Sequence, residues 1–360
     1  MLCRKSAIKI FSLFANHTKY IRSFSSVCQT RMTTHNDKTL SMESRLTLSD
    51  KHTMPQLGLG TWRSEPEKVQ NIVRDAILHC GYRLIDAAWV YQNEDEVGNG
   101  IHEAIEQSQG KIKREDIFVT TKLWNQHHTT EDVEWALRDS LKKLRLDYVD
   151  LFLIHWPVAF KNMTENLWSQ NEDGKTRYFA ENVTLVDTWK AMEKLVDLKL
   201  TRSIGVSNFS PSEIDEILKI ARIKPSVNQI ELHPYFNQHE LREYCAHHNI
   251  TITSYCPLSN LKRENERAED VSALYNAVIQ EIAQSKHKTT AQIIIRWHLQ
   301  HGLSVIPKTV TQERLIENSG VFDFALSDHE MLGIDHLTQT NRRRFVNPPF
   351  RPADKPIFDD

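Results

Sequence analysis

The residues best suited to chemistry lie at the ends of short apolar, β-branched segments. Three successive segments end in or lead directly to Asp86, Lys122 and His155. The next four segments carry or precede further polar side chains: Ser207, Asn208, Gln229, Tyr255 and Lys308. One such residue alone would be explained as a helix cap, a salt bridge or a buried polar group, but seven successive cases would not. If the segments are parallel strands, these groups meet at one carboxyl edge, where a barrel enzyme builds its active site.

These side chains must be positioned by strands that alternate with helices. Apolar segments predict strands at residues 56–60 (the weakest), 83–86, 117–121, 149–154, 203–206, 227–230, 250–254 and 303–306. Helical apolar spacing predicts helices at residues 65–80, 129–144, 184–199, 210–221, 238–248, 271–285 and 289–301. Ser64 and Ser210 each precede a proline-containing helix start, so we expect both to be N-caps. Eight strands with intervening helices fit either a closed barrel or an open doubly wound sheet.

The glycine motif GLGTWR at residues 58–63 helps to choose between these folds. It begins like a dinucleotide fingerprint, but Arg63 stands where the third glycine should be. No phosphate-binding loop of the NTPase type occurs either. The prediction is therefore an α/β fold of the (β/α)8 (TIM) barrel type in a single domain. We expect loops at residues 158–182 and 259–270, and a solvated loop or helix face for the charged run 262–270.

Composition excludes several other classes of protein. The 360 residues carry 45 Lys and Arg against 47 Asp and Glu, which argues against nucleic-acid binding through a broad basic face. Five cysteines without a C-x-x-C pair predict a reduced compartment, and the adjacent histidines lack further ligands at metal-site spacing, so no metal is expected. The longest uncharged N-terminal run, residues 10–18, is too short to span a bilayer, so no transmembrane segment is expected.

The N-terminal leader differs in chemistry from the rest of the chain. Residues 1–36 contain six Lys or Arg and no Asp or Glu, so the remaining chain is acidic. Residues 1–31 have the composition of a mitochondrial transit peptide. The alternatives are a disordered tail, or upstream sequence skipped when translation begins at Met32 or Met42. We therefore expect a leader over residues 1–45, a barrel over residues 46–360, and a cytoplasmic protein, or a mitochondrial one if residues 1–31 direct import.

Seven motifs in order resemble the aldo-keto reductases from residue 46 to about residue 349. They are MPQLGLGTW (54–62), DAAWVY (86–91), TKLW (121–124), LIHWP (153–157), GVSNF (205–209), NQIELHPY (228–235) and IPKT (306–309). The resemblance is closest to general aldehyde and aldose reductases. It implies NADPH-dependent reduction of a small aldehyde or ketone by direct hydride transfer, with no nucleic-acid partner, and we expect a monomer. Substrate choice is expected to rest on residues 158–182 and 340–360.

The resemblance also implies a catalytic tetrad of Asp86, Tyr91, Lys122 and His155. Reducing a carbonyl leaves an alkoxide that needs a proton, and Tyr91 can donate it, although a free phenol has a pKa of about 10. A nearby Lys122 ammonium favours the phenolate and so lowers that pKa. Asp86 can keep a buried Lys122 charged. His155 can hydrogen-bond the substrate oxygen and orient it.

Further positions match the cofactor and substrate residues of the family. The implied cofactor-binding residues are Thr61, Trp62, Asp86, Ser207, Asn208, Gln229, Tyr255, Leu258, Asn260, Lys308, Thr309, Arg314, Glu317 and Asn318. Lys308 with Arg314 suits a 2′-phosphate, which favours NADPH over NADH; alternatively, Arg314 and Glu317 form an i, i+3 pair on a helix. The implied substrate-binding residues are Trp62, Tyr91, Trp124, His155 and Trp156.

One motif departs from the family, and several functions stay open. After Tyr255 the chain continues CPLSN at residues 256–260, where the family has SPLGS, and the missing glycine is expected to weaken cofactor binding rather than the chemistry. One alternative function is an NADPH-binding regulatory or structural protein of the same fold, resembling channel subunits or crystallins, with little turnover. Within enzymes, the alternative is a hydroxysteroid or other ketone reductase. An unrelated phosphate-binding barrel isomerase is a third possibility.

Overall fold

The computed structural model describes residues 40–163, 166–170, 178–259, 272–348, 350 and 358. Residues 1–39 of the predicted leader, which include the possible transit peptide 1–31, lie outside these residues, as do the charged run 262–270 and Asn260. So do parts of the segments expected to choose the substrate.

Eight parallel strands form the sheet of the described residues, in the order β10-β9-β8-β7-β6-β5-β4-β3. They are β3 (Leu59–Gly60), β4 (Leu84–Asp86), β5 (Phe118–Leu123), β6 (Val149–Ile154), β7 (Thr201–Ser207), β8 (Val227–Glu231), β9 (Thr251–Tyr255) and β10 (Ser304–Val305). Parallel bridges from Leu57 to Val305 and from Gly60 to Lys308 join the last strand to the first. The sheet is therefore closed, and the predicted (β/α)8 fold is confirmed.

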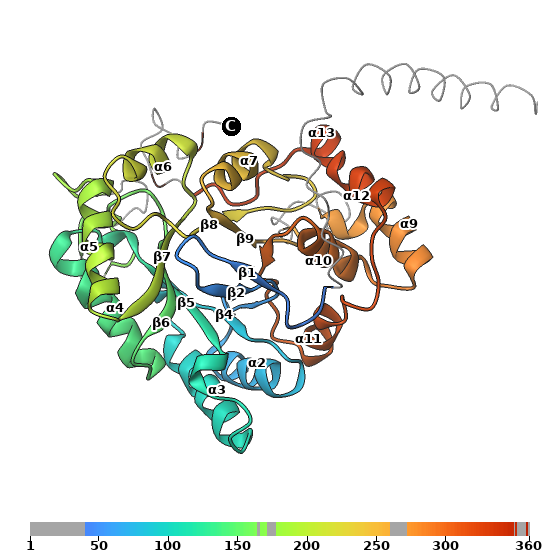
Figure 1. Cartoon of the computed structure of the whole chain (residues 1–360), viewed down its shortest axis with the longest axis horizontal. Coiled ribbons are helices and arrows are strands. Elements are labelled where there is room, and N and C mark those ends of the chain that lie inside the picture. The colour runs from blue at the N-terminus through green and yellow to red at the C-terminus, as the bar shows by residue number, and fades with distance from the viewer. Residues whose placement is uncertain are drawn as a thin grey trace, which may run out of the picture. The chain divides into compact units, whose positions relative to one another are not determined.

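Helices follow the strands and surround the barrel (Figure 1). They are α2 (Pro66–His79), α3 (Glu94–Gln107), α4 (Thr130–Leu144), α5 (Leu185–Asp197), α6 (Pro211–Leu218), α7 (His239–His247), α9 (Ala277–Lys286), α10 (Thr290–Gln300), α11 (Gln312–Ser319), α12 (Asp328–Asp335) and α13 (Leu337–Asn341). Short 3-10 turns lie at Trp89–Tyr91 (η1), Arg114–Asp116 (η2), Asn125–His127 (η3) and Ala273–Tyr275 (η4). Contacts link the helices in order from α2 to α7 and from α9 to α11, and α11 packs beside α2.

Two short strands that sequence patterning did not predict, β1 (Arg45–Thr47) and β2 (Thr53–Pro55), pair as an antiparallel hairpin. The hairpin brings Leu48 and Met54 into the apolar cluster that fills one end of the barrel interior. The other members come from the barrel strands and their ends: Leu84, Phe118, Leu151, Leu153, Val227 and Ile306. The hairpin contacts the amino ends of β7 and β10 through His52 and Pro55, whereas the polar strand ends lie at the carboxyl end, where barrel enzymes build their sites.

The glycines of the GLGTW motif serve barrel closure. A Cβ at Gly60 would lie 2.9 Å from the carbonyl oxygen of Ile306, and one at Gly58 would lie 2.5 Å from the Leu84 side chain. Neither distance leaves room for a methyl group, so both positions require glycine. The motif therefore allows β3 to approach its neighbours, rather than cradling a pyrophosphate in the Rossmann manner.

Two local predictions differ from the structure. The N-cap of α2 is Glu65 rather than Ser64, because Pro66 takes the first helical position. The predicted helix 271–285 is divided into η4 and α9. Asn276 has extended backbone and accepts a hydrogen bond from the Val278 amide, so it starts a new helix. Ser210 does cap α6, where the Glu213 side chain accepts from the Ser210 amide at 2.8 Å.

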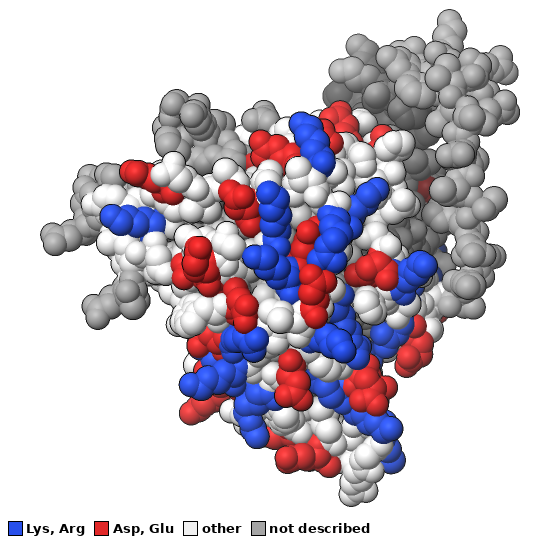
Figure 2. Space-filling view, turned by 60° about the vertical axis from the view of Figure 1, so that its left-hand side comes forward, with Lys and Arg blue, Asp and Glu red and all other residues white. Residues whose placement is uncertain are grey.

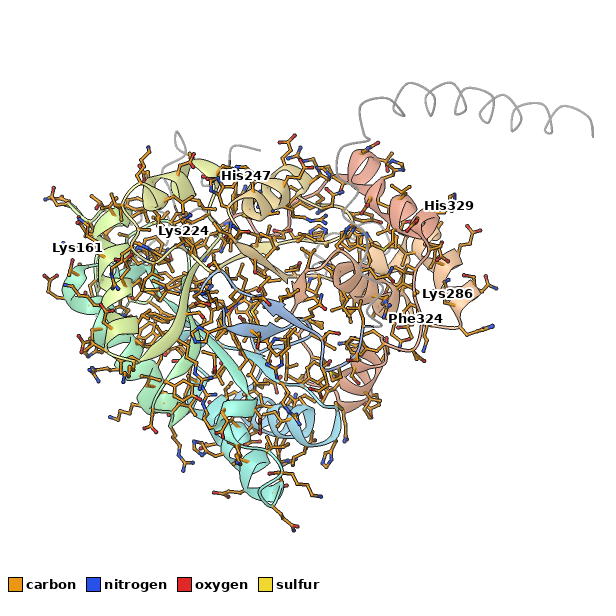
Figure 3. The ribbon with its side chains drawn as sticks, in the orientation of Figure 1. Lys161, Lys224, His247, Lys286, Phe324 and His329 are labelled. Carbon is orange, nitrogen blue, oxygen red and sulfur yellow. The ribbon has the colours of Figure 1, made fainter. Side chains whose placement is uncertain are left out.

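The outer surface carries charge of both signs. On the side of α4 and α5, basic and acidic side chains are interspersed rather than gathered by sign (Figure 2). Figure 3 places His247 of α7 and His329 of α12 on the outside of the helical layer. Among the described residues, no helix has both the length and the apolar character needed to cross a membrane.

Candidate active site

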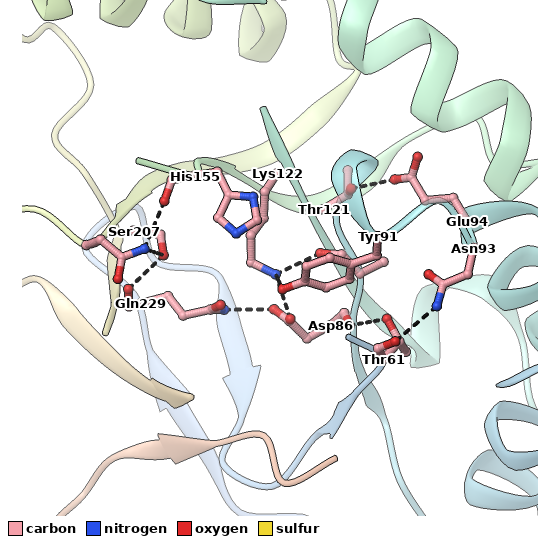
Figure 4. A network of polar contacts seen from close by, with 12 residues as sticks. Thr61, Asp86, Tyr91, Asn93, Glu94, Thr121, Lys122, His155, Ser207 and Gln229 are labelled. Atoms are coloured by element: carbon pink, nitrogen blue, oxygen red, sulfur yellow. Dashed lines mark hydrogen bonds and ion pairs between the residues drawn. The ribbon is translucent and has the colours of Figure 1, made fainter. Parts of the chain in front are cut away.

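A buried ion pair between Lys122 and Asp86 lies at the carboxyl end of the barrel, and Lys122 also contacts the Tyr91 hydroxyl. The Lys122 Nζ on β5 donates to Asp86 Oδ1 on β4 at 2.6 Å, to the Ala87 carbonyl at 2.8 Å and to the Tyr91 hydroxyl at 3.2 Å (Figure 4). The Lys122 side chain is fully buried. Its three donor positions are therefore all used, and the network fixes the ammonium against the tyrosine.

The charges of this network determine which group holds a proton. Burial alone lowers the pKa of Lys122, but Asp86 and Tyr91 together raise that pKa above its ordinary value, so the lysine stays charged. For Tyr91, burial raises the pKa, and the Lys122 charge acts in the opposite direction. The expected lowering by Lys122 is present, but the net pKa of Tyr91 is raised. The phenol therefore keeps its proton at neutral pH.

His155 faces the tyrosine from the end of β6. The two rings form an edge contact with centroids 5.9 Å apart. Burial, with Lys122 and His128, holds the pKa of His155 well below its usual range, so the imidazole is neutral. Its Nδ1 is buried with no hydrogen-bond partner among the described residues. A neutral imidazole has one N–H to donate, which suits it to hydrogen-bond a substrate oxygen.

The ends of β7, β8 and β9 bring four more predicted residues together. The Ser207 hydroxyl donates to the Gln229 carbonyl at 2.8 Å, and the Gln229 side-chain amide donates to Asp86 Oδ2 at 2.7 Å. Asn208 Nδ2 donates to the His155 carbonyl at 3.0 Å, and Asn208 Oδ1 accepts from the Tyr255 hydroxyl at 2.7 Å. These residues therefore connect the ion pair to a continuous polar surface of amides and hydroxyls.

Five of the predicted cofactor-binding residues lie apart from this network: Lys308, Thr309, Arg314, Glu317 and Asn318. Lys308 is beside β3 through its bridge to Gly60, and its side chain is exposed. On α11, Arg314 is exposed and Asn318 is buried. Glu317 accepts a hydrogen bond from the Thr289 hydroxyl at 2.6 Å, which directs its carboxylate toward α10. Thr309 is buried and its hydroxyl accepts from the Thr311 amide at 3.1 Å.

Of the predicted substrate residues, two tryptophans lie against His155. The ring centroid of Trp124 is 5.5 Å from that of His155, and Trp156 stacks on His155 at 6.3 Å. Trp62 differs, because 45% of it is exposed and Arg63 lies over its ring. Thr61, its neighbour, is buried and donates to the Asp86 carbonyl at 2.8 Å.

Residues 256–259, the described part of the loop after β9, include two residues in a left-handed backbone conformation. Cys256 and Ser259 have φ values of 53° and 66°, in the left-handed region that glycine occupies without strain. For a residue with a Cβ this conformation costs about 1 kcal/mol. The Ser259 hydroxyl offsets part of that cost by accepting from the Ala273 amide at 3.3 Å. Leu258 is half-buried against the core.

Two residues next to Tyr91 were missing from the predicted site. Asn93 is buried and its Nδ2 donates to the Thr61 and Ser64 carbonyls at 3.0 and 3.2 Å. Glu94 is also buried and accepts from the Thr121 hydroxyl at 2.6 Å and the Ser140 hydroxyl at 3.0 Å. Together they tether the start of α3, and hence the Tyr91 turn, to β5, α4 and the turn after β3 (Figure 4). The only sequence signal was that polar residues directly follow the tyrosine.

The buried Glu94 predicts a specific pH dependence of stability. Burial raises its pKa from 4.5 to about 7. Between these values the unfolded chain releases the proton that the folded chain retains, so the free energy of unfolding falls as pH rises from 4.5 to 7 and this loss is complete above 7. Glu94→Gln has no such loss, so its stability relative to wild type should increase by roughly 3 kcal/mol between pH 4 and pH 8.

Urea unfolding of both proteins at pH 4 and pH 8 measures this difference. Asp95→Asn is the matched control, since Asp95 is an exposed acid in the same helical turn. A relative stability that does not change with pH would show that folding does not raise the pKa of Glu94.

His298 and His301, which are close in sequence, bond to protein groups rather than to a shared metal-ligand set. His298 contacts the Ile294 and Leu232 carbonyls at 2.8 and 3.0 Å, and His301 pairs with Asp335 at 2.8 Å. In the described part of the chain, no three His, Cys, Asp or Glu side chains are grouped as metal ligands.

Comparison with known proteins identifies the class to which this barrel belongs. The model of the aldo/keto reductase family matches residues 56–339. The chain belongs to the aldo-keto reductase family, and it is therefore an oxidoreductase, as the resemblance predicted.

Two curated relatives and one solved structure show how far the similarity extends. Aldo-keto reductase family 1 member A1-A of Danio rerio is 47% identical over 85% of this chain and 93% of the relative. Aldo-keto reductase family 1 member A1 of Xenopus tropicalis is 46% identical over 82% and 89% of the two chains. The structure of the aldose reductase from Schistosoma japonicum matches with a TM-score of 0.77 and 41% identity, covering 84% of this chain and 94% of that one.

Proposed function

We propose that this protein reduces aldehydes or ketones to alcohols with NADPH, and that Tyr91 is the proton donor. The observation that carries the proposal is the contact of one buried ammonium, Lys122, with both Asp86 and the Tyr91 hydroxyl. The His155 ring lies beside the same tyrosine, with ring centroids 5.9 Å apart. A charged lysine, a protonated phenol and a neutral imidazole are the protonation states that carbonyl reduction requires.

Each residue has a role that follows from its geometry. Bound NADPH would supply the hydride that the carbonyl carbon accepts. Tyr91 donates its proton to the carbonyl oxygen, and the Lys122 ammonium stabilises the phenolate left behind. Asp86 keeps Lys122 charged in a buried position. His155 orients the oxygen by donating a hydrogen bond to it.

The side chains around the tetrad suit a reduced nicotinamide dinucleotide phosphate. Ser207, Asn208 and Gln229 supply the hydroxyl and amide groups that a carboxamide would bond, and Tyr255 supplies a ring to stack on the nicotinamide. At the other end, Lys308 and Arg314 are exposed cations that would hold a 2′-phosphate. This donor set supports NADPH in preference to NADH. Leu258 and Asn260 would face the pyrophosphate by analogy with the family.

The substrate side is aromatic, which favours small carbonyl compounds with an apolar part. Trp124, Trp156 and Phe160 form one buried cluster beside His155. Aldehydes are the first substrates to test, including aldoses, because the Schistosoma japonicum relative is named an aldose reductase.

A cofactor-oxidation assay tests the function directly. Purified protein is mixed with NADPH and a panel of short, aromatic and sugar aldehydes and a steroid ketone, and absorbance of the reduced nicotinamide is followed. We expect aldehyde-dependent oxidation, faster with NADPH than with NADH at equal concentration. The rank order of the panel separates an aldehyde reductase from a ketone reductase.

Cofactor binding is measured in parallel by nicotinamide fluorescence. If the protein binds NADPH but turns over no carbonyl compound, the proposed enzyme function is wrong, and the protein is a cofactor-binding protein of the same fold. A protein that leaves the fluorescence unchanged would have neither function, as expected of an unrelated barrel.

A further inference from the structure

A buried carboxylate outside the tetrad holds the C-terminal segment (residues 342–348 and Phe350). Glu231 ends β8 and is 1% exposed. Its Oε1 accepts from the Phe345 amide at 2.7 Å and from the His233 Nε2 at 2.8 Å, and its Oε2 accepts from the Val346 amide at 2.8 Å. Burying a carboxylate is unfavourable unless donors surround it. Two of these three donors belong to the C-terminal segment, so the carboxylate and the segment stabilise each other.

Neighbouring contacts hold the same segment in place. The Arg343 amide donates to the Tyr235 carbonyl at 3.1 Å. The rings of Phe345 and His233 are 5.0 Å apart, and the Arg344 guanidinium lies 4.3 Å from the ring centre of Phe236. These contacts all come from the stretch that directly follows β8. Glu231, at the end of β8, adds the two carboxylate contacts to this set.

The anchored segment reaches the aromatic wall beside His155. Phe350 is buried, and its ring lies 5.8 Å from Trp124, 5.1 Å from Trp156 and 5.3 Å from Phe160. Val346 packs on the same cluster. Trp124 and Trp156 in turn contact His155. A short chain of contacts therefore joins Glu231, through Phe345, Val346 and Phe350, to the side of the site where a carbonyl substituent would lie.

We propose that Glu231 is a positioning residue that fixes the C-terminal segment, and with it Phe350, as a wall of the substrate pocket. The inference deepens the proposed carbonyl reduction and rests on it. The wall would bind carbonyl compounds with an aromatic or long apolar substituent, because Phe350, Trp124 and Trp156 present rings to it. A short aldehyde would not reach it. Glu231 does not touch the reacting atoms, so it acts on substrate binding rather than on proton transfer.

Glu231→Gln tests the anchor without depending on activity. A glutamine turns an NH2 group toward a backbone amide, so at least one of the two amide contacts is lost. The segment contains Arg342, Arg343 and Arg344, which are trypsin sites next to the anchor. With NADPH present, we expect trypsin to cleave the variant after these arginines at least tenfold faster than wild type, as followed by mass spectrometry. Glu240→Gln, an exposed acid of α7, should leave cleavage unchanged.

Steady-state kinetics on two substrates test the positioning role. For Glu231→Gln we expect KM for an aromatic aldehyde to rise about tenfold, the loss typical of a missing apolar contact. KM for a short aldehyde and kcat for both should stay within about twofold. Phe350→Ala should give the same KM change while keeping the trypsin resistance of wild type. The double variant should show no further KM increase, because both changes remove one wall.

Each outcome decides a separate statement. Equal trypsin rates for Glu231→Gln and wild type would overturn the anchor. Faster cleavage with unchanged KM for the aromatic aldehyde would overturn the positioning role. A lower KM in Phe350→Ala would also overturn it, since Phe350 would then obstruct the pocket rather than form its wall. If the wild-type protein shows no turnover, both the proposed function and the role of Glu231 in substrate binding are wrong. The trypsin cleavage rates still test whether Glu231 anchors the C-terminal segment.

Discussion

Tyr91→Phe is expected to lower kcat for aldehyde reduction by 10²- to 10⁴-fold, the range typical for loss of a general acid. The variant keeps the aromatic ring and its contact with His155 but removes the proton that the carbonyl oxygen needs. The Lys122 ammonium is a poor substitute for this acid, because Asp86 raises the pKa of Lys122 and holds its proton. NADPH oxidation with and without aldehyde measures the loss.

Cofactor binding separates this effect from general damage. Tyr91→Phe should bind NADPH as wild type does, because the hydroxyl contacts Lys122 rather than the residues proposed to hold the cofactor. Tyr178→Phe is the matched control, since this tyrosine is 42% exposed. Turnover by Tyr91→Phe within about tenfold of wild type would mean that another group supplies the proton.

Lys122→Met is expected to abolish measurable turnover and also to destabilise the fold by about 3–5 kcal/mol. Methionine leaves the buried Asp86 carboxylate without its cation, while the Gln229 side-chain amide still donates to it. The phenolate of Tyr91 loses its stabilising charge at the same time, which moves the pKa of Tyr91 further above its usual range. Stability is measured by urea unfolding and turnover by NADPH oxidation.

A second substitution separates the two effects of Lys122→Met. Adding Asp86→Asn removes the unpaired charge, so the double variant should regain most of the lost stability but none of the activity. Lys142→Met, at an exposed position of α4, controls for the loss of a lysine. A double variant with restored turnover would show that the ion pair is structural and that Tyr91 works without it.

The strands and their polar ends could be predicted because their signals are local. Period and residue type identify β4, β5 and β6 within a few neighbours of Asp86, Lys122 and His155. The rule that parallel strands share one carboxyl edge then places these residues on the same rim. Placing these residues on one rim therefore requires no knowledge of the distances between them. The β1–β2 hairpin escaped prediction because its strands are only three residues each.

The residues that support the site could not be predicted in the same way. Gln229 bonds Asp86 across 143 positions of the chain, and Glu231 bonds Phe345 across 114. Glu94 resembles any other acid at the start of a helix until its neighbours are known. No local pattern marks such a residue, since its surroundings are assembled from separate strands and loops.

The sequence by itself therefore predicted an α/β barrel and the polar residues that follow its strands, because hydrophobic period and residue type are properties of consecutive residues. Only the tertiary structure decided which atoms meet and what charge each group carries. The raised pKa of Tyr91 and the lowered pKa of His155 both follow first from burial, which is set by packing between distant segments. The same packing places the Glu231 carboxylate, at the end of β8, against the Phe345 and Val346 amides.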